Sequence, residues 1–276
     1  MVILDGKKIS NDIKQEIKLI VDKMNKKPKL VVIQIGDDFA SNSYIKAKQK
    51  FALETDIIFE HKKLDSDLSE ENIINIITEL NVNKSVAGIM VQLPLPNNLN
   101  THKIINSINP IKDIDGLTNE NLGKLFNYLD GYYPCTPLGI MELLKRYNIE
   151  LKGKHAVILG RSSLVSKPLS QMLLKEDVTV TIVHSQTKNL SDVIKLGDII
   201  ISAIGKPKFI TREMIKNDAI IIDVGINYFE DKLCGDVDFD NVKEIASYIT
   251  PVPGGVGPMT VAMLFQNIIK SYSIKE

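Results

Sequence analysis

The stretch AVILGRSSLVSKP, residues 156–168, starts as an apolar run and turns at Gly160 into a segment that suits the start of a helix. Proline fits the first turn of a helix, where its missing N–H costs nothing, so we expect a helix to begin near Lys167 and Pro168. The free N–H groups and positive dipole end of such a helix favour a bound phosphate. The stretch therefore indicates a strand, a phosphate-binding turn and a helix, although it holds one glycine where the dinucleotide fingerprint has three. Taken alone, one glycine after a strand is equally compatible with an ordinary turn.

Short apolar runs alternate with helix-length amphipathic stretches along the rest of the chain. The runs lack polar alternation, as is typical of parallel strands covered on both faces; they span residues 30–36, 86–94, 155–160, 178–183, 198–205 and 219–225. This alternation predicts an α/β fold with a mostly parallel sheet. A segment rich in Gly, Pro, Asp and Asn, 110–139, separates the first two runs from the last four, and we place a domain boundary near Thr136 and Pro137. A final helix is expected over about residues 260–270.

Composition excludes several classes of protein. The chain has 276 residues, and its 34 basic residues are balanced by 34 acidic ones, so nothing favours a nucleic-acid or anionic-membrane partner. The two cysteines and four histidines lie in no metal-ligand spacing, which indicates no metal site, no disulfide framework and a reducing compartment. The N-terminus lacks the apolar region of a signal peptide, and no apolar run is long enough to span a bilayer. We therefore expect a soluble cytoplasmic protein that binds neither nucleic acid nor membrane.

The residues after the run at 178–183 bear on the choice of dinucleotide. An acidic residue at this place bonds the ribose 2′-OH of NAD, whereas a nearby arginine accommodates the 2′-phosphate of NADP. Here the run is followed by His184 and Ser185 with no acid, and Arg161 is available from the first loop. The pattern therefore favours NADP. The alternative is that Arg161 is a solvated loop residue and Ser185 forms a turn.

Residues 36–54 predict a turn followed by a helix capped by Asp38 or Ser41. At about 100° per residue, the apolar side of this helix carries Tyr44, Ala47, Phe51 and Ala52. Lys48 falls on the same side, one turn after Tyr44. Such a lysine either snorkels, with a buried stem and a wet ammonium, or is desolvated, so that its pKa falls toward the working pH and it becomes usable in acid/base chemistry.

Two further polar residues are candidates for the site of Lys48. Gln92 ends an apolar run, and ligands of parallel sheets bind at the carboxyl ends of strands. It is equally well explained as a polar residue that ends a strand. Asp115 precedes Gly116 in an irregular loop, where an Asx turn accounts for it; its carboxylate is also suited to hold a ring that carries adjacent N–H donors.

Nine motifs, taken in order, resemble the bifunctional methylenetetrahydrofolate dehydrogenase/cyclohydrolase family along nearly the whole chain. They are SNSYIKAK (41–48), VQLPLP (91–96), KDIDG (112–116), YPCTPLG (133–139), GRSSLVSKP (160–168), IGKP (204–207), IDVGIN (222–227), GDVDF (235–239) and ITPVPGGVGPMT (249–260). The resemblance implies an N-terminal α/β catalytic domain that binds folate, residues 1–136 plus 260–276, and a C-terminal Rossmann-like, parallel-sheet NADP-binding domain, residues 137–259. It further implies that the C-terminal helix packs on the N-terminal domain and that the substrate lies between the domains.

The resemblance also implies roles for individual residues. Lys48 would be the catalytic lysine, with Tyr44 stacking on the folate ring system, Gln92 tuning the lysine and Asp115 holding the pterin. Arg161 and Ser185 would receive the 2′-phosphate, and the substrate and cofactor contacts would be completed by Gly254, Gly255, Pro258, Gly160, Ser162 and Ile226. Ser166 departs from the family pattern, which has glycine there. If the position needs a positive φ, serine is strained; otherwise its hydroxyl adds a contact.

The activity implied by the resemblance has two steps in one-carbon folate metabolism, which supplies purine biosynthesis. NADP-dependent oxidation of 5,10-methylenetetrahydrofolate gives the 5,10-methenyl compound, and hydrolysis of that compound gives 10-formyltetrahydrofolate. A homodimer through the cofactor domains is implied as well. The alternatives are a monofunctional, NAD-preferring dehydrogenase and a catalytically silent module that senses NADP or folate. The presence of Lys48 disfavours the first, and the presence of Tyr44, Lys48, Gln92 and Asp115 together disfavours the second.

Overall fold

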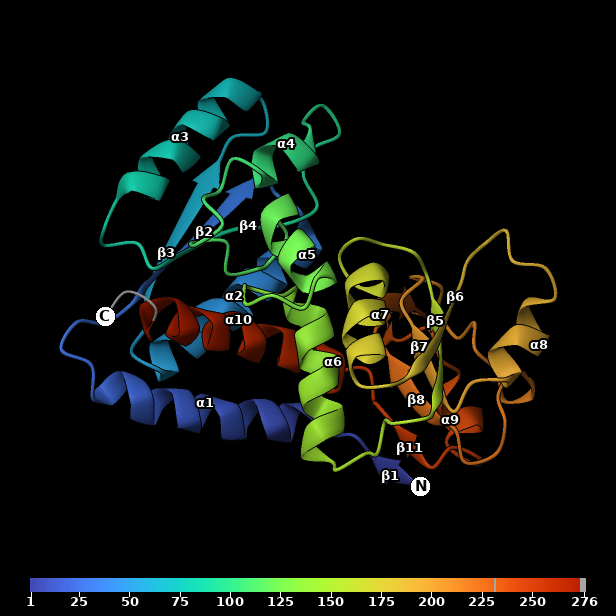
Figure 1. Ribbon diagram of the computed structural model, residues 1–276. Helices are drawn as coiled ribbons and strands as arrows, with labels where there is room; N and C mark the ends of the chain where they lie inside the picture. The colour runs from blue at the N-terminus through green and yellow to red at the C-terminus, as the bar shows by residue number, and fades with distance from the viewer. Residues whose placement is uncertain (231, 274–276) are drawn as a thin grey trace. The chain divides into compact units, whose positions relative to one another are not determined.

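The computed structural model of the chain describes residues 1–230 and 232–273, and the chain divides into two compact units. Unit 1 comprises Met1–Ser10 and Thr136–Thr260. Unit 2 comprises Asn11–Cys135 together with Val261 and the residues after it. Figure 1 shows that each unit contains a sheet with its own helices.

Unit 1 is built on a six-stranded sheet in which every pair of neighbours is parallel. In spatial order the strands are β1 (Val2–Ile3), β11 (Tyr248–Ile249), β8 (Ile220–Asp223), β7 (Ile199–Ser202), β5 (His155–Leu159) and β6 (Thr179–Val183). The chain leaves β5 for β6 on one side and continues to β7 on the other. The carboxyl ends of β5 and β7 therefore form the topological switch point at which doubly wound sheets bind ligands.

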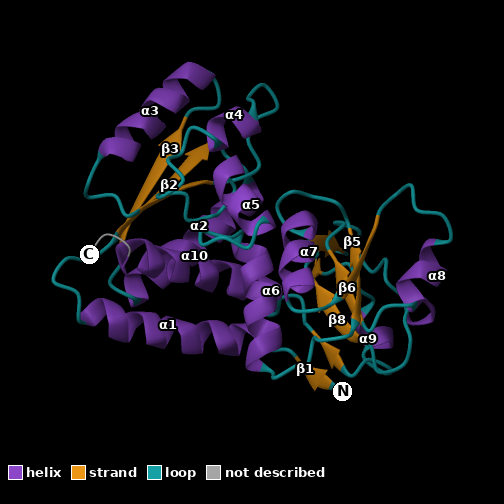
Figure 2. Ribbon diagram, in the orientation of Figure 1, coloured by secondary structure: helices purple, strands orange, loops and turns teal. Residues whose placement is uncertain are grey.

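Helices, which Figure 2 shows in purple, and a hairpin complete unit 1. They are α6 (Cys135–Arg146), α7 (Ser166–Lys175), α8 (Leu190–Lys195), the 3-10 helix η1 (Arg212–Met214), α9 (Phe239–Val242) and the antiparallel pair β9 (Asn227–Phe229) and β10 (Lys232–Cys234). In the hydrophobic core of unit 1, side chains of the central strands pack against side chains of the segments that follow these strands. Its fully buried residues include Val157, Ile200, Ile221 and Val242. Burial of these β-branched side chains drives the sheet to form.

Unit 2 holds a three-stranded parallel sheet in the order β3 (Ile58–Leu64), β2 (Lys29–Ile35), β4 (Gly88–Val91). Its helices are α1 (Gly6–Asp22, from Asn11 on), α2 (Phe39–Glu54), α3 (Glu70–Val82), α4 (Thr101–Ile105), α5 (Asn119–Phe126) and α10 (Val256–Ser273, from Val261 on). Alternate residues of β2, including Val31 and Ile33, pack with Ile73 and Ile77 of α3 on one face. Helices α2 and α10 meet through Phe51 and Phe265, whose rings stack with centroids 4.5 Å apart.

All six strands predicted from apolar runs are present, as β2, β4, β5, β6, β7 and β8. Helix α2 is capped by Asp38, whose side chain accepts a hydrogen bond from the Ser41 N–H. Helix α7 begins one residue before the predicted start, and α10 begins at Val256, four residues before its predicted start. The exposed Ala47 does not belong to the apolar stripe predicted for α2.

The first ten residues lie in a different unit from the one predicted. The sequence assigns residues 1–136 to one domain, but Met1–Ser10 belong to unit 1 in the structure. The reason is that β1 pairs in parallel with β11, with Val2 opposite Tyr248 and Ile3 opposite Ile249. Hydrogen bonds from Val2 N to Ser247 O and from Leu4 N to Ile249 O fix this edge strand.

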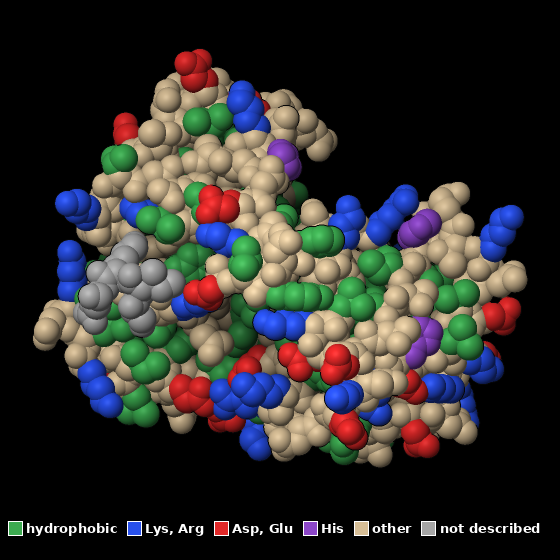
Figure 3. All heavy atoms as spheres, in the orientation of Figure 1, with side chains coloured by type: hydrophobic (Ala, Val, Ile, Leu, Met, Phe, Trp, Pro, Cys, Tyr) green, Lys and Arg blue, Asp and Glu red, His purple; other side chains and the backbone are tan. Residues whose placement is uncertain are grey.

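The surface carries both signs of charge, interspersed over the visible face in Figure 3. Charged side chains of the described residues form ion pairs, such as Lys18 with Asp56 and Lys216 with Asp198. Within residues 1–230 and 232–273, no helix combines the length and the apolar character that crossing a membrane requires.

Candidate active site

Lys48 and Gln92 form a buried pair in unit 2. Lys48 is only 4% exposed, and its Nζ donates to Gln92 Oε1 over 2.6 Å. Gln92 follows the last residue of β4 and is 8% exposed, and its Nε2 donates to Leu93 O over 2.7 Å. Because the amide nitrogen is engaged by that carbonyl, the amide oxygen is the atom presented to the lysine. The lysine is therefore desolvated rather than snorkelling.

Burial shifts two pKa values at this site in opposite directions. Burial lowers the pKa of Lys48 to about 8, and the negative charge of Asp115 partly opposes the shift. Burial also raises the pKa of Asp115 to about 6, with Lys48 opposing and Asp113 reinforcing the rise. An ammonium with a pKa near 8 exchanges its proton near neutral pH, which an ordinary lysine does not.

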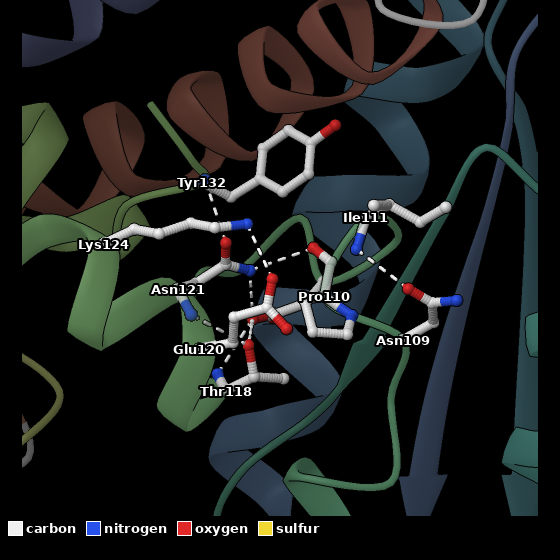
Figure 4. Close-up of polar contacts among 9 residues, drawn as sticks. Asn109, Pro110, Ile111, Thr118, Glu120, Asn121, Lys124 and Tyr132 are labelled. Atoms are coloured by element: carbon white, nitrogen blue, oxygen red, sulfur yellow. Dashed lines mark hydrogen bonds and ion pairs between the residues drawn. The ribbon is translucent and has the colours of Figure 1, made fainter. Parts of the chain in front are cut away.

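The loop that carries Asp115 is anchored by Asp113, which is 1% exposed. Its carboxylate accepts hydrogen bonds from the Thr118 N–H and hydroxyl and from Asn121 Nδ2, each within 2.9 Å. Asn121 extends the network, since its Nδ2 also donates to Pro110 O and its Oδ1 accepts from the Tyr132 N–H (Figure 4). The Asp113 carboxylate therefore has a structural role, which is to fix the loop through these hydrogen bonds.

Cys135 and Tyr44 complete the surroundings of the pair. The Cys135 thiol is buried near Asp115, and burial, with the charge of Asp115, raises the pKa of this thiol. Tyr44 is half-buried on α2, one turn before Lys48. Unit 2 therefore brings together Lys48, Gln92, Asp115 and Cys135.

The turn after β5 in unit 1 has the form of a dinucleotide site. Gly160 has a φ of +112°, and a Cβ there would lie 2.7 Å from the Ala203 carbonyl oxygen, so the turn requires glycine. Arg161 and Ser162 follow it and are exposed, and the Ser162 hydroxyl accepts from the Val165 N–H over 3.1 Å. The turn lies at the switch point of the sheet, so its geometry fits a phosphate group.

Ser166 is the first residue of α7 and has ordinary helical backbone, so the strain considered for this position does not arise. The residue is fully buried. Its Oγ has no hydrogen-bond partner among the described residues. A buried polar atom of this kind, at a turn predicted to bind phosphate, is compatible with a polar ligand.

Two buried carboxylates hold the loops after β7 and β8. Asp236 accepts hydrogen bonds from the backbone N–H groups of residues 204–206 and from the Ser202 hydroxyl and Asn227 Nδ2. Asp223 accepts from the N–H groups of Gly225, Asp236 and Val237. Ile226, predicted to contact the cofactor, lies between these two residues in the sequence and is 46% exposed.

Ser185, predicted to bind the 2′-phosphate, is exposed in the turn after β6. This turn is closed by a hydrogen bond of 2.9 Å from the His184 N–H to Thr187 Oγ1.

The predicted substrate residues Gly254, Gly255 and Pro258 lie in unit 1, whereas Tyr44, Gln92 and Asp115 lie in unit 2. Gly254 has a φ of +109°, and its carbonyl accepts from the Lys7 N–H over 2.8 Å. A Cβ on Gly255 would lie 2.6 Å from Pro251 O. The chain must therefore have glycine at both positions to form this loop.

Sequence analysis did not single out Cys135, Asp113, Asp223 or Asp236 as functional residues. All four lie inside the quoted motifs, namely YPCTPLG, KDIDG, IDVGIN and GDVDF. A buried acidic residue in a loop gives no periodicity that would identify it. The motif match is the only feature of the sequence that points to them.

Comparison with known proteins places the two parts of the chain in one family. The catalytic-domain model of tetrahydrofolate dehydrogenase/cyclohydrolase matches residues 4–115, and the NAD(P)-binding-domain model matches residues 134–276. The bifunctional protein FolD of Campylobacter concisus is 47% identical over 279 residues, covering 100% of this chain and 99% of that protein.

Solved structures agree with the sequence comparison. The bifunctional FolD enzyme of Campylobacter jejuni has a TM-score of 0.97 and 43% identity, with 100% of both chains covered. The Trypanosoma brucei dehydrogenase-cyclohydrolase, solved with NADP cofactor and an inhibitor, has a TM-score of 0.95 and 34% identity, covering 100% of this chain and 98% of that one. On the family models, the full-length identity and the shared fold, this chain belongs to the tetrahydrofolate dehydrogenase/cyclohydrolase family.

Proposed function

We propose that the chain catalyses both reactions of its family. The first is oxidation of 5,10-methylenetetrahydrofolate to the 5,10-methenyl cation, with loss of a hydride from the one-carbon bridge. The second is addition of water to the methenyl carbon, cleavage of its bond to N5 and release of a proton, which gives 10-formyltetrahydrofolate. The observation that carries the proposal is the buried Lys48–Gln92 pair beside Asp115.

Lys48 is the residue assigned to the second step. Hydration of the methenyl carbon requires a group that takes a proton from water and returns one to the departing nitrogen. A lysine whose pKa lies near 8 holds both protonation states at neutral pH. Gln92 accepts from Nζ and so fixes the direction of the amine. Asp115 holds the pterin ring, and Tyr44 stacks on it.

The cofactor of the first step is NADP, which when bound supplies the hydride acceptor. Arg161 and Ser185 are exposed side chains that would bind its 2′-phosphate, and no acidic residue follows β6 at the position that favours NAD. Gly160, Ser162 and Ile226 would contact the rest of the dinucleotide. Gly254, Gly255 and Pro258 complete the substrate site. Positioning of the substrate is the main task of this step.

The direct test is a spectroscopic assay of purified protein with 5,10-methylenetetrahydrofolate, run separately with NADP and NAD, that follows reduced nicotinamide and the methenyl compound. We expect reduction of NADP with little methenyl accumulation. In Lys48→Met, we expect methenyl to accumulate because hydrolysis is lost. Full cyclohydrolase activity in Lys48→Met would overturn the role of the lysine, and binding of NADP without any turnover would support the sensor alternative.

The assignment of Arg161 has its own test. Replacing Arg161 with Ala removes the guanidinium but leaves the Gly160 turn in place. We expect kcat/KM with NADP to fall by about one to two orders of magnitude, since a charge-assisted bond to phosphate is worth about 1.5–3 kcal/mol, while the value with NAD changes little. Equal losses with both cofactors would remove Arg161 from recognition of the 2′-phosphate.

We also propose that the protein is a cytoplasmic homodimer that binds neither nucleic acid nor membrane. Strand β6 supports a dimer through the cofactor domain, because it lies at the sheet edge and, within the described part of the chain, pairs only with β5. Ile182 of this strand is 36% exposed. Sedimentation equilibrium of the wild type and Ile182→Lys checks this, and a wild-type monomer at micromolar concentration would contradict it.

A further inference from the structure

Asn267 of α10 is a buried polar residue to which the proposed reaction assigns no role. The residue is 6% exposed. Its Nδ2 donates to the Ile114 carbonyl oxygen over 2.8 Å and to the Tyr133 carbonyl oxygen over 3.3 Å. The same nitrogen lies 3.8 Å from Cys135 Sγ. One amide therefore ties two distant segments, the loop of Asp115 and the chain before α6, to a single helix of unit 2.

The Ile114 peptide that Asn267 holds is the peptide immediately before Asp115. Cys135 Sγ donates to the same carbonyl oxygen over 3.5 Å. The side chain of Ile114 is fixed as well, because it is fully buried against Gly88, where an added Cβ would lie 2.6 Å from atoms of both Ile114 and Ile268. The main chain on the N-terminal side of Asp115 is thus held by α10 in addition to the hydrogen bonds of Asp113.

We propose that Asn267 is a positioning residue that keeps the Asp115 carboxyl beside Lys48. The inference rests on the proposed function, since it concerns the same site. An amide is suited to the task because its two N–H groups can serve two carbonyl oxygens at once. An apolar side chain of similar size would leave both carbonyls buried without that donor, and the loop would relax to regain hydrogen bonds.

Displacement of Asp115 has a defined electrostatic consequence. The ionisable groups that act on one another here are Lys48, Asp115, Asp113 and Cys135. The charge of Asp115 raises the pKa of Lys48 against the effect of burial. If the Asp115 carboxyl moves away, the pKa of Lys48 falls below its wild-type value of about 8.

The test compares Asn267→Leu, which removes the amide, with Asn267→Ser, which keeps a shorter donor and gives a second measurement if the leucine variant folds poorly. Thr55→Val is the control: Thr55 caps the C-terminus of α2 and is fully buried in the same unit, and its hydroxyl donates to Phe51 O and Ala52 O of that helix. All variants are first checked for folding by circular dichroism and thermal melting.

In Asn267→Leu we expect the KM for 5,10-methylenetetrahydrofolate to rise about tenfold, the size expected from loss of a buried hydrogen bond, with the KM for NADP unchanged. The inflection near pH 8 of the cyclohydrolase pH profile, which reflects Lys48, moves to lower pH in this variant. Asn267→Ser shows both effects to a smaller extent, and Thr55→Val shows neither.

A folded Asn267→Leu with wild-type folate KM and an unmoved inflection would overturn the proposal. Equal losses for folate and NADP, as general destabilisation would cause, would overturn it too. Failure of the proposed function is distinguishable, because the wild-type protein would then lack both activities.

Discussion

At the scale of single residues, the unpartnered hydroxyl of Ser166 has an energetic consequence that can be measured. A buried polar group without a hydrogen bond costs about 1–3 kcal/mol, so Ser166→Ala should stabilise the protein by about 1 kcal/mol or more. Ser170 on the same helix provides the control, because it is also buried but its Oγ donates to Lys167 O over 2.7 Å. Urea unfolding of the protein without ligands checks the difference. Equal effects of Ser166→Ala and Ser170→Ala would show that the Ser166 hydroxyl is satisfied in solution.

Lys48 and Asp115 together predict how stability depends on pH. The folded pKa of Asp115 is raised to about 6, so its contribution to stability is complete below its ordinary pKa and is lost as pH rises through 6. The folded pKa of Lys48 is lowered to about 8, so its contribution is complete above its ordinary pKa and is lost as pH falls through 8.

The pair therefore destabilises the protein most between pH 6 and 8, where both groups are charged. A difference of one between the folded and the unfolded pKa of a group corresponds to about 1.4 kcal/mol. We expect the stability of wild type minus that of the double variant Lys48→Met/Asp115→Asn, measured by urea unfolding, to be lowest in this range and to rise on either side. A difference independent of pH would show that the two groups keep ordinary pKa values in the folded protein.

The candidate site could be predicted from sequence only where a single segment carried the information. The helical projection of 36–54 placed Lys48 on the apolar side of its helix, and the structure buries it there. The contacts of Asn267 with Ile114 and Tyr133 span 153 and 134 residues along the chain, and no local pattern encodes them. Burial of a single residue follows from its own segment, whereas a hydrogen bond between distant segments requires the fold.

At the scale of secondary structure, the strands that could be predicted are those with continuous apolar side chains. Strands β4, β7 and β8 are buried at every position, as parallel strands covered on both faces should be. Strand β3 was not predicted, because it lies at the sheet edge and its sequence IFEHKKL mixes charges with apolar residues. The two-residue strands β1 and β11 are too short to show any pattern, and pairing within the folded unit creates them.

Of the two carboxylates that hold the loops after β7 and β8, that of Asp236 accepts hydrogen bonds both from the loop after β7 and from Asn227. Asp236→Asn keeps the shape of the side chain but turns one acceptor into a donor that faces N–H groups. Because Asp236 is fully buried and accepts three backbone hydrogen bonds, we expect a loss of about 3 kcal/mol, the upper range for a broken buried network. NADP affinity, measured by calorimetry, should fall with it, since these loops begin at the carboxyl edge of the sheet.

Asp238→Asn is the matched control for this substitution. Asp238 is two residues away, is only partly buried, and accepts from the exposed Asn241 side chain. We expect a change within about 0.5 kcal/mol, as for most surface substitutions. If Asp236→Asn changed stability and NADP affinity no more than this control, the carboxylate would not organise the loops.

At the scale of the whole molecule, each unit has a hydrophobic core of its own. The core of unit 1 includes Val157, Ile200 and Ile221, and the core of unit 2 includes Val31, Ile73 and Ile89. Each core is formed by parallel strands and helices of its own unit. The family models divide the chain in the same sense, into a catalytic and an NAD(P)-binding domain. Two cores of this kind can open independently, and a ligand that binds one of them then protects that unit alone.

Hydrogen exchange in the presence of NADP tests this independence. At a concentration of one hundred times Kd, a ligand adds about 2.7 kcal/mol to the stability of the state that binds it, which slows exchange by global opening about a hundredfold. We expect this protection in strands β5, β7 and β8 of unit 1, and little in β2 and β4 of unit 2. Helix α10 runs through both units, with the boundary after Thr260, so its amides from Val261 on should follow unit 2. Equal protection of both sheets by NADP would mean that the chain unfolds as one cooperative body in spite of its two cores.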